Sequence, residues 1–332
     1  MKKVIYTLTF ALAFVACKKE PKDYVTLSGT ITNPNSDSLC VAQRSIIKTI
    51  KVNPDGTFSD TLKVEDGNYL LYDGKERAIV YLQNGYDLNI KADTKSFDES
   101  ITYEGEGSEA NNFLAKKGLL KEQLIDFNEL FTLDEAAFNA KLEANDKAFK
   151  DLLNSVAHLD STFVNGQGTE IERIKQDLSR MYNEKMAVSS LKGQESPKFV
   201  DYENYVGGNM SLDDLKGKYV YIDLWATWCG PCKQEIPYLK AVEKEYHNKN
   251  IAFVSISLDR NSAYETWRRM VKDKELSGIQ LFAKEDNDFA RAYMVSGIPR
   301  FILIDPAGIV VDANAPRPSS SKLIDLFKTL DI

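Results

Sequence analysis

The feature that most constrains the fold is an apolar segment that runs directly into two closely spaced cysteines. Residues 219–225, YVYIDLW, have the composition of a buried strand, and the sequence WCGPC at 228–232 follows at once and opens a stretch with helical periodicity. Cys229 would therefore lie at the N-terminus of a helix. Unpaired backbone N–H groups and the positive end of the helix dipole stabilise a thiolate at such a position. We therefore expect Cys229 to be a nucleophile.

The two-residue spacer between the cysteines suits thiol-disulfide exchange. It puts Cys232 one helical turn after Cys229, close enough for its sulfur to resolve a mixed disulfide formed at Cys229. Pro231 has helical φ and lacks an N–H that the first turn would leave unpaired, so it tightens that turn. Gly230 keeps the approach to the sulfur uncrowded. The pair is expected to cycle between dithiol and disulfide.

Other uses of this pair, and other classes of partner, are disfavoured. A zinc site would need two further ligands, whereas the chain has no second CxxC and only two histidines, His158 and His247, both in helical segments. The formal net charge of −7 gives no reason to expect nucleic acid as a partner. We expect no metal and no cofactor besides the cysteines themselves.

The first 17 residues have the pattern of an export signal. Two lysines precede an apolar stretch, residues 4–16, that is too short to span a bilayer, and Cys17 follows it. One interpretation is an ordinary cleaved signal in which Cys17 is incidental. We favour a second one, in which residues 14–17, FVAC, resemble a bacterial lipoprotein processing site. Cys17 would then be the lipidated first residue of the mature chain, and residues 18–23 a short tether to the membrane.

With 332 residues, the chain is long enough for two or three domains. Residues 24–107 predict a small β-sandwich-like domain. Short segments in which apolar and polar residues nearly alternate are separated by turn signals at 53–56, 66–67 and 84–85. It contains Cys40, whose expected role is that of a small apolar residue in a strand. No cluster of residues in this domain suggests catalysis.

Residues 108–190 predict a helical region. Helices are expected near 109–127, 133–157 and 168–187, the second opened by a capping box from Thr132 to Glu135 and the third preceded by a break at 165–168. Both front regions could hold the active site away from the membrane or could recognise a partner, and the sequence leaves these two roles open.

Residues 191–332 alternate strand and helix and predict an α/β domain with a central sheet covered by helices. The expected strands are 219–225, 251–258, 279–283, 301–305 and 309–312, and the expected helices begin at Gly230, Ser262, Asp286 and Ser320. Residues 305–308, DPAG, predict a hairpin turn.

Several motifs of this last region resemble those of a known family. They are DLKGK at 214–218, WATWCGPC at 225–232, Pro237 and GIP at 297–299. On these motifs, residues 196–332 resemble the thioredoxin superfamily and, within it, the TlpA/ResA-type thiol-disulfide oxidoreductases. The full layout, a lipoprotein signal, a β domain, a helical spacer and this module, is similar to a class of such lipoproteins in Bacteroidetes.

The resemblance implies a substrate-binding surface around Cys229. It implies a cis peptide before Pro299, which would place the Ile298 backbone beside the cysteines, where it can pair with an extended substrate segment. Together with Gly230, Pro231 and Trp228 these residues form the expected substrate-binding set. For Trp228, covering Cys229 and simple packing both remain open.

Asp223 is the third expected catalytic residue. Burying an ionised carboxylate without a partner in an apolar strand costs roughly several kcal/mol, so the presence of Asp223 in this strand needs a reason. The resemblance implies that it is the buried acid that exchanges a proton with Cys232. The lysine that partners this acid in thioredoxins is replaced near Ser255. The alternative is an aspartate exposed at the end of a strand.

These observations predict a membrane-anchored thiol-disulfide oxidoreductase that faces the periplasm in the cell envelope. We expect it to reduce disulfides of exported polypeptides, with apocytochrome c as one candidate substrate, and to receive electrons from a membrane thiol-reducing donor. One alternative is net oxidation or isomerisation of exported proteins. Another is a lipid-anchored binding or assembly protein in which the thiol module is secondary.

Overall fold

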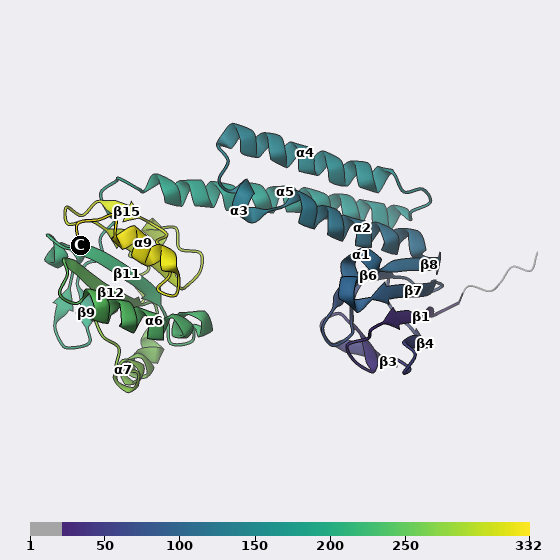
Figure 1. The fold of residues 1–332 in the computed structure, drawn as a ribbon, viewed down its shortest axis with the longest axis horizontal. Helices are drawn as coiled ribbons and strands as arrows, with labels where there is room; N and C mark the ends of the chain where they lie inside the picture. The colour runs from purple at the N-terminus through teal and green to yellow at the C-terminus, as the bar shows by residue number, and fades with distance from the viewer. Residues whose placement is uncertain (1–21) are drawn as a thin grey trace, which may run out of the picture. The chain divides into compact units, whose positions relative to one another are not determined.

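The computed structural model describes residues 22–332, which form two compact units (Figure 1). Unit 1 extends to Gln176 and unit 2 begins at Asp177, so the division falls inside helix α5 (Ser161–Ser190). Most of the predicted helical region therefore groups with the strands that precede it. The predicted signal, Cys17 and all but the last residues of the tether lie outside the described residues. Within residues 22–332, no helix combines the length and the apolar character needed to cross a bilayer.

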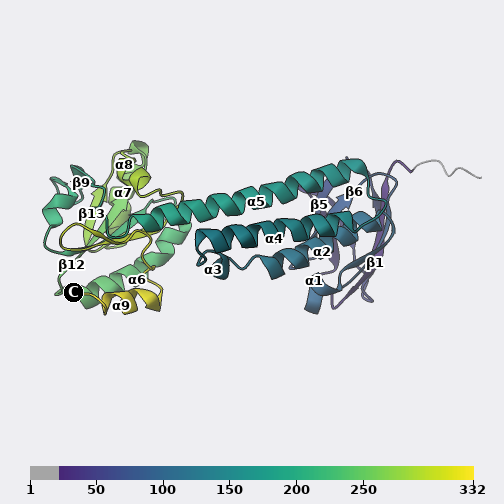
Figure 2. The same cartoon turned by 90° about the horizontal axis from the view of Figure 1, so that it is seen from above.

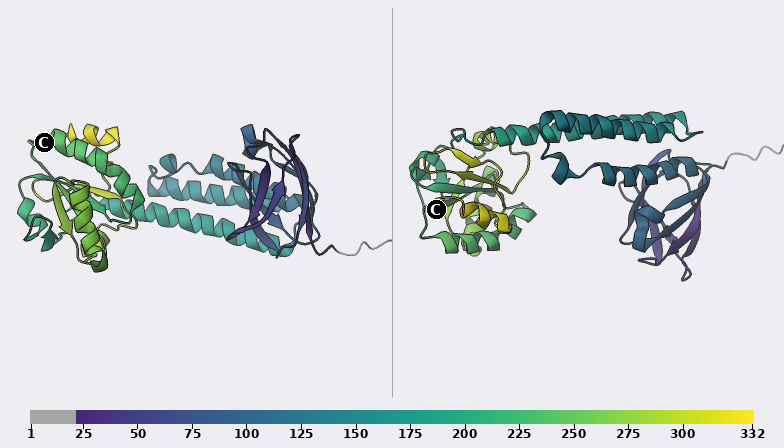
Figure 3. Two further views of the ribbon diagram at one scale, coloured as in Figure 1. Left: turned by 90° about the horizontal axis from the view of Figure 1, so that it is seen from below. Right: turned by 45° about the horizontal axis from the view of Figure 1, so that its top comes forward.

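Unit 1 contains two four-stranded sheets that face each other, as the predicted β-sandwich requires (Figure 3). The sheet orders are β4-β1-β7-β8 and β3-β2-β5-β6. The strands are β1 (Val25–Thr32), β2 (Ser38–Ala42), β3 (Ile46–Lys51), β4 (Thr57–Leu62), β5 (Gly67–Tyr72), β6 (Arg77–Leu82), β7 (Asp87–Asp93) and β8 (Thr102–Glu106). Alternate residues of β1, such as Val25 and Leu27, are fully buried between the sheets. This period of two is the reason that the segment folds as a half-buried strand.

Helix α2 (Ser108–Leu124) is fixed to both sheets by two consecutive asparagines. The Asn111 side chain accepts from the Tyr81 N–H at 2.8 Å and donates to the Tyr81 carbonyl at 2.9 Å, on edge strand β6. The Asn112 side chain makes the same pair of hydrogen bonds to Tyr103 on edge strand β8, at 3.0 and 2.7 Å. Each amide thus replaces the missing neighbouring strand at one position of its sheet.

Unit 1 contains five further helices or parts of helices, and two of them differ from the prediction. The five are η1 (Thr94–Ser96), α1 (Phe97–Ser100), α3 (Phe127–Leu130), α4 (Glu135–Asn154) and the first part of α5. The predicted capping box from Thr132 is wrong, because Asp134 caps α4 by accepting from the Ala137 N–H at 2.8 Å. A carboxylate directly before the first turn is a stronger cap than a hydroxyl two residues earlier.

The predicted helix break at residues 165–168 is also wrong, because α5 runs through Gly166 and Gly168. Phe163, Gln167 and Ile171 are all buried, and their spacing of four residues continues one helical face across both glycines. Each glycine costs roughly 1 kcal/mol of helix propensity relative to alanine. Burial of the continuous face outweighs that cost. Figure 2 shows α5 beside α4 and α2, and Lys175 of α5 pairs with Glu143 of α4 at 2.7 Å.

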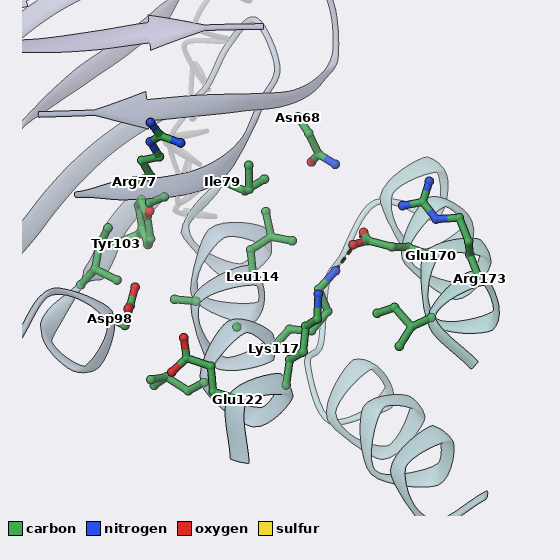
Figure 4. Close-up of a pocket in the computed structure, with 17 residues that line it drawn as sticks. Asn68, Arg77, Ile79, Asp98, Tyr103, Leu114, Lys117, Glu122, Glu170 and Arg173 are labelled. Carbon is green, nitrogen blue, oxygen red and sulfur yellow. Dashed lines mark ion pairs between the residues drawn. The ribbon is translucent and has the colours of Figure 1, made fainter. Parts of the chain in front are cut away.

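A pocket of about 410 Å³ lies in unit 1 between β6, α2 and α5 (Figure 4). In it, the Lys117 ammonium is 2.9 Å from the Glu170 carboxylate and 2.6 Å from the Gln167 side-chain oxygen. Burial lowers the pKa of Lys117, and the hydrogen bond and charge of Glu170 oppose this shift. The charge of the buried Lys117 ammonium is therefore neutralised by Glu170, within unit 1. Gly118 also lines the pocket, and a Cβ atom there would meet nothing within 4 Å.

Unit 2 has a thioredoxin-like fold, built on a mixed seven-stranded sheet of order β10-β9-β13-β12-β11-β14-β15. Strands β11, β12 and β13 are parallel, and β14 runs antiparallel to β11. The strands are β9 (Tyr202–Asn204), β10 (Asn209–Met210), β11 (Tyr219–Trp225), β12 (Ile251–Ser257), β13 (Ile279–Phe282), β14 (Arg300–Ile304) and β15 (Val310–Asp312). The helices are η2 (Leu212–Leu215), α6 (Gly230–Tyr246), η3 (Asn261–Ala263), α7 (Tyr264–Asp273), α8 (Asp288–Ala292) and α9 (Ser321–Phe327).

Central strand β11 is buried on both faces. Ile222 and Leu224 pack with Phe289 of α8 on one face, whereas Tyr221 packs with residues of α6 and α9 on the other. Figure 2 shows α6 and α9 on the same side of the sheet. This double burial is the reason that the strand is a nearly continuous apolar run. Asp223 lies on the α6 side of this run, opposite Ser255 of β12.

Candidate active site

The cysteine pair lies where β11 gives way to α6. Cys229 is the N-cap of α6, with extended backbone angles, and Gly230 and Pro231 form the first turn. The Cys229 sulfur accepts from the Cys232 N–H at 3.1 Å, and the two sulfurs are joined in a disulfide. A sulfur so placed receives a backbone donor and the positive end of the helix dipole. This is the environment that lowers the pKa of a cysteine thiol.

The two cysteines and their tryptophans differ in exposure. Cys229 is 3% exposed and Cys232 is 4% exposed, and both pack with buried Trp225. Trp228, by contrast, is 69% exposed. An exposed indole beside the nucleophile can contact a bound polypeptide without any rearrangement of the core. Packing alone therefore does not account for Trp228.

The loop before β14 lies beside the nucleophile. The bond between Ile298 and Pro299 is cis, as expected from the GIP motif, and the Ile298 carbonyl oxygen is 3.7 Å from the Cys229 sulfur. The structure therefore brings together Cys229, Ile298 and Pro299, which lie about 70 positions apart in the sequence. Backbone groups in this position can pair with an extended peptide.

Asp223 is buried behind the cysteines, which excludes the exposed strand-end alternative. The residue is 8% exposed, and its Oδ1 atom is buried with no hydrogen-bond partner in the described part of the chain. Burial raises its pKa to about 8, and the negative charges of Glu243 and Glu235 add to the shift. A carboxyl with such a pKa can accept and release a proton near neutral pH.

Three other buried acids surround the site and were not predicted from the sequence. Glu235 accepts from the Ser319 N–H at 3.0 Å and from its hydroxyl at 2.9 Å, which ties α6 to the segment before α9. Asp259 is fully buried and accepts from Thr227 in the loop before Cys229. Glu243 lies further along α6 and is 6% exposed.

A sequence signal existed for two of these acids. Glu235 follows Cys232 by three residues, and Glu243 follows Leu239 by four, so both fall on the buried face of a helix whose start was predicted correctly. An acid on such a face is the same signal that identified Asp223 in β11. Asp259 follows a strand, and its contact with Thr227 depends on tertiary structure alone.

Other residues considered in the sequence do not join this site. Cys40 lies in β2 of unit 1, half-buried and free, with its sulfur 3.8 Å from the Thr49 hydroxyl. His247 directly follows α6 and contacts the Lys244 carbonyl. Within residues 22–332, no group of three or more His, Cys, Asp and Glu side chains is placed to hold a metal ion.

Known proteins match the same region of the chain. The Redoxin family model matches residues 191–325. The thiol-disulfide oxidoreductase ResA of Bacillus subtilis (strain 168) is 32% identical over 138 residues, which cover 42% of this chain and 75% of ResA. The thioredoxin-like protein YneN of the same organism is 32% identical over 137 residues, covering 41% of this chain and 78% of YneN.

Solved structures match it as well. A solution structure of a putative thiol-disulfide oxidoreductase from Bacteroides vulgatus has 46% sequence identity and a TM-score of 0.37, covering 42% of this chain and 91% of that one. The Redoxin match at residues 191–325 includes the cysteine pair and the cis-proline loop, and the identity to ResA extends over three quarters of that enzyme. The chain therefore belongs to the ResA family of thiol-disulfide oxidoreductases.

Proposed function

We propose that this protein is a lipid-anchored oxidoreductase of the cell envelope that reduces disulfides in exported polypeptides through Cys229 and Cys232. The observation that carries this proposal is the position of the Cys229 sulfur. It lies at the N-terminus of α6, 3.1 Å from the Cys232 N–H and 3.7 Å from the Ile298 carbonyl. A nucleophile and a peptide-binding edge are thus adjacent.

The reaction begins with the reduced enzyme. The Cys229 thiolate attacks one sulfur of a substrate disulfide, forms a mixed disulfide and releases the other substrate sulfur as a thiolate, which takes a proton from water. Cys232 then loses its proton to Asp223, and its sulfur attacks the Cys229 sulfur. The second substrate thiolate leaves, and the enzyme retains the disulfide. Two electrons have passed from the enzyme to the substrate.

Substrate binding is assigned to the surface around Cys229. The Ile298 carbonyl, held next to cis-Pro299, pairs with the backbone of an extended substrate segment, and Trp228 covers the reacting sulfurs from the exposed side. Gly230 adds no bulk on the approach side. Backbone pairing requires little of the substrate sequence, so many exported polypeptides would fit, with apocytochrome c as one candidate.

Reduction outside the cytosol requires a supply of electrons. We assign this to a membrane thiol-reducing donor that attacks the Cys229–Cys232 disulfide and regenerates the dithiol. Lipidation of Cys17 would hold the enzyme at the membrane and facing the periplasm, within reach of this donor. The β-rich and helical parts of unit 1 would either act as a spacer from the membrane or recognise a partner.

An insulin-reduction assay tests the enzymatic part of the proposal. We expect wild type to accelerate disulfide reduction by dithiothreitol and both Cys229→Ser and Cys232→Ser to abolish the acceleration. Cys40→Ser is the matched control, because Cys40 is a free cysteine in unit 1, and it should behave as wild type. Equal rates for wild type and the two active-site variants would refute the proposal and favour a binding or assembly protein.

The direction of electron flow is tested by equilibration of the full chain with glutathione buffers. A reductant of thioredoxin type should have a potential near about −270 mV, whereas a strong oxidant lies near about −120 mV. A value at the oxidising end would replace reduction by oxidation or isomerisation. Anchoring is tested separately: Cys17→Ser, but not Cys40→Ser, should abolish labelling by radioactive palmitate and release the protein from membranes.

A further inference from the structure

A small cavity lies behind Cys232, on the side of the cysteine pair that faces the core. Its volume is about 10 Å³, which is close to what a single water molecule needs. Asp223 and Trp225 of β11, Cys232 and Glu243 of α6 and Gln280 of β13 are among the residues that line it. The cavity therefore connects the resolving cysteine with two buried carboxyl groups.

The polar atoms around this cavity lack partners. Asp223 Oδ1, Glu243 Oε1, Gln280 Oε1 and Trp225 Nε1 are buried and make no hydrogen bond to other atoms in residues 22–332. All four side chains are more than nine-tenths buried. Buried polar atoms are normally paired with protein or with an ordered water. The three oxygens accept hydrogen bonds and only the indole N–H can donate one. At least one further hydrogen-bond donor is therefore needed, and a water molecule or a protonated carboxyl can supply it.

Glu243 extends from this cavity to the surface. Its second carboxylate oxygen accepts a hydrogen bond from the Ser277 hydroxyl, and Ser277 is exposed. Lys240, one turn earlier on α6, also lines the cavity, and its side chain is 37% exposed. One carboxylate oxygen of Glu243 is thus buried in the interior, and the other accepts a hydrogen bond from a hydroxyl in contact with solvent.

The charges around the two carboxyls favour a single shared proton. Asp223 is faced by Glu235, Glu243 and Cys232 of α6 and by Tyr221 of its own strand, whereas Ser255 of β12 and Gln280 of β13 bring no charge. Lys240 is the cation beside Glu243. Burial raises the pKa of Glu243, and the Ser277 hydrogen bond and Lys240 oppose this shift. Two neighbouring acids in a poorly solvated site do not readily ionise together.

We propose that Glu243 relays the proton between Asp223 and solvent in each exchange cycle. This inference rests on the proposed function and concerns the same site. When the Cys232 sulfur attacks the mixed disulfide, its proton passes to Asp223, from there through a cavity water to the Glu243 carboxylate, and out at Ser277. When the donor reduces the enzyme, the proton returns by the same route to Cys232. No electron passes through the carboxyls. Glu243 acts on Cys232 only through Asp223, so its part is to carry the proton and not to react with the substrate.

The test is the pH profile of the resolving step, measured by stopped flow as release of thiol from a preformed mixed disulfide of the full chain. Glu243→Gln keeps the shape of the side chain and removes its titration. We expect the rate near pH 7 to fall about 10-fold, which is less than the about 100-fold lost with a direct acid-base group, because Asp223 remains in place. The solvent isotope effect should rise, and the acid limb should move to lower pH because Asp223 loses a neighbouring charge. Glu245→Gln, an exposed acid on the same helix, is the matched control and should change none of these.

Ser277→Ala gives a second, independent reading, because it alters only the exposed end of the route. It should slow the resolving step in the same direction and leave the unfolding temperature unchanged. A wild-type rate and pH profile in both variants would overturn the relay, as would a loss that is equal at every pH with an unchanged isotope effect. If Glu243→Gln fails to fold, Ser277→Ala alone decides. Failure of the proposed function would appear differently, as a wild-type protein without Cys229-dependent insulin reduction.

Discussion

The carboxylate of Asp259 holds Thr227 by two hydrogen bonds, 2.9 Å from its backbone N–H and 2.8 Å from its hydroxyl. Asp259 also accepts from the Ser257 hydroxyl at 2.7 Å, and it is fully buried. Thr227 lies two residues before Cys229, so this acid fixes the loop from which the nucleophile is presented. Strand β12 and the active-site loop are thereby connected through one side chain.

Replacement of Asp259 by alanine should loosen this loop and destabilise unit 2. It leaves two donors of Thr227 and the Ser257 hydroxyl without their acceptor, and hydrogen bonds to a charged group contribute about 1.5 to 3 kcal/mol each. Because contributions within one hydrogen-bond network are not additive, we expect Asp259→Ala to lower the unfolding free energy by about 3 to 5 kcal/mol, and to reduce insulin reduction even well below the melting temperature. Ser257→Ala, which keeps both bonds to Thr227, should retain activity. An active Asp259→Ala variant would show that the loop is held by other contacts.

The raised pKa of Asp223 predicts how stability depends on pH. The folded-state value of about 8 exceeds the ordinary 3.8, so the fold prefers the protonated carboxyl. This contribution is fully present below about pH 4 and is lost as the pH rises toward 8. Asp223→Asn cannot ionise, so its stability relative to wild type should grow over this window, by up to about 6 kcal/mol. Thermal unfolding at pH 4.5, 6.5 and 8.5 measures the difference. A constant difference would mean that the Asp223 carboxyl is solvated.

Trp228 should affect substrate affinity more than stability. Its side chain is 69% exposed, so Trp228→Ala removes little buried surface and should change the unfolding free energy by less than about 0.5 kcal/mol. If the indole covers bound polypeptide, the KM for insulin should rise about 3- to 10-fold, as loss of one aromatic contact implies. Steady-state kinetics separates KM from kcat. An unchanged KM would assign substrate binding to the backbone of the cis-proline loop instead.

Gly118 should be a site of easy stabilisation. It lies inside α2, and a Cβ atom there would meet nothing within 4 Å. Gly118→Ala should therefore raise the free energy of unfolding by about 1 kcal/mol, because alanine has the higher helix propensity. Gly105→Ala is the opposite control, because Gly105 has φ of +93° and its Cβ would lie 2.1 Å from the Asp87 carbonyl oxygen. Urea unfolding should place the two variants on opposite sides of wild type.

The sequence was most informative where local pattern and burial agree. Strand β11 has the predicted limits, because its apolar run is buried on both faces and the WCGPC motif ends it. The start of α6 at Gly230 was predicted for the same reason. Helix α7 begins two residues later than expected, since η3 occupies Asn261–Ala263. The location of the cysteine pair and its neighbouring proline loop was thus accessible from motifs alone.

Features that depend on partners distant in the sequence were not accessible. The glycines in α5 resemble a break until the buried face that spans them is known. The position of Glu235 on the buried face of α6 could be read from the sequence, but its hydrogen bonds to Ser319, 84 residues away, could not. The cavity shared by Asp223 and Glu243 exists only when β11, α6 and β13 are assembled. Local patterns identify elements, whereas the acid groups of this site acquire their properties from the assembled fold.

The consecutive amides of Asn111 and Asn112 have a consequence beyond the position of α2. Strands β6 and β8 are at the edges of their sheets, and an uncovered edge can template pairing with a strand of another molecule. Because the two residues are adjacent, a single helical turn occupies backbone groups on both edges at once. The same turn of α2 therefore removes one pairing position from each edge, at Tyr81 of β6 and at Tyr103 of β8, that a strand of another molecule could otherwise use.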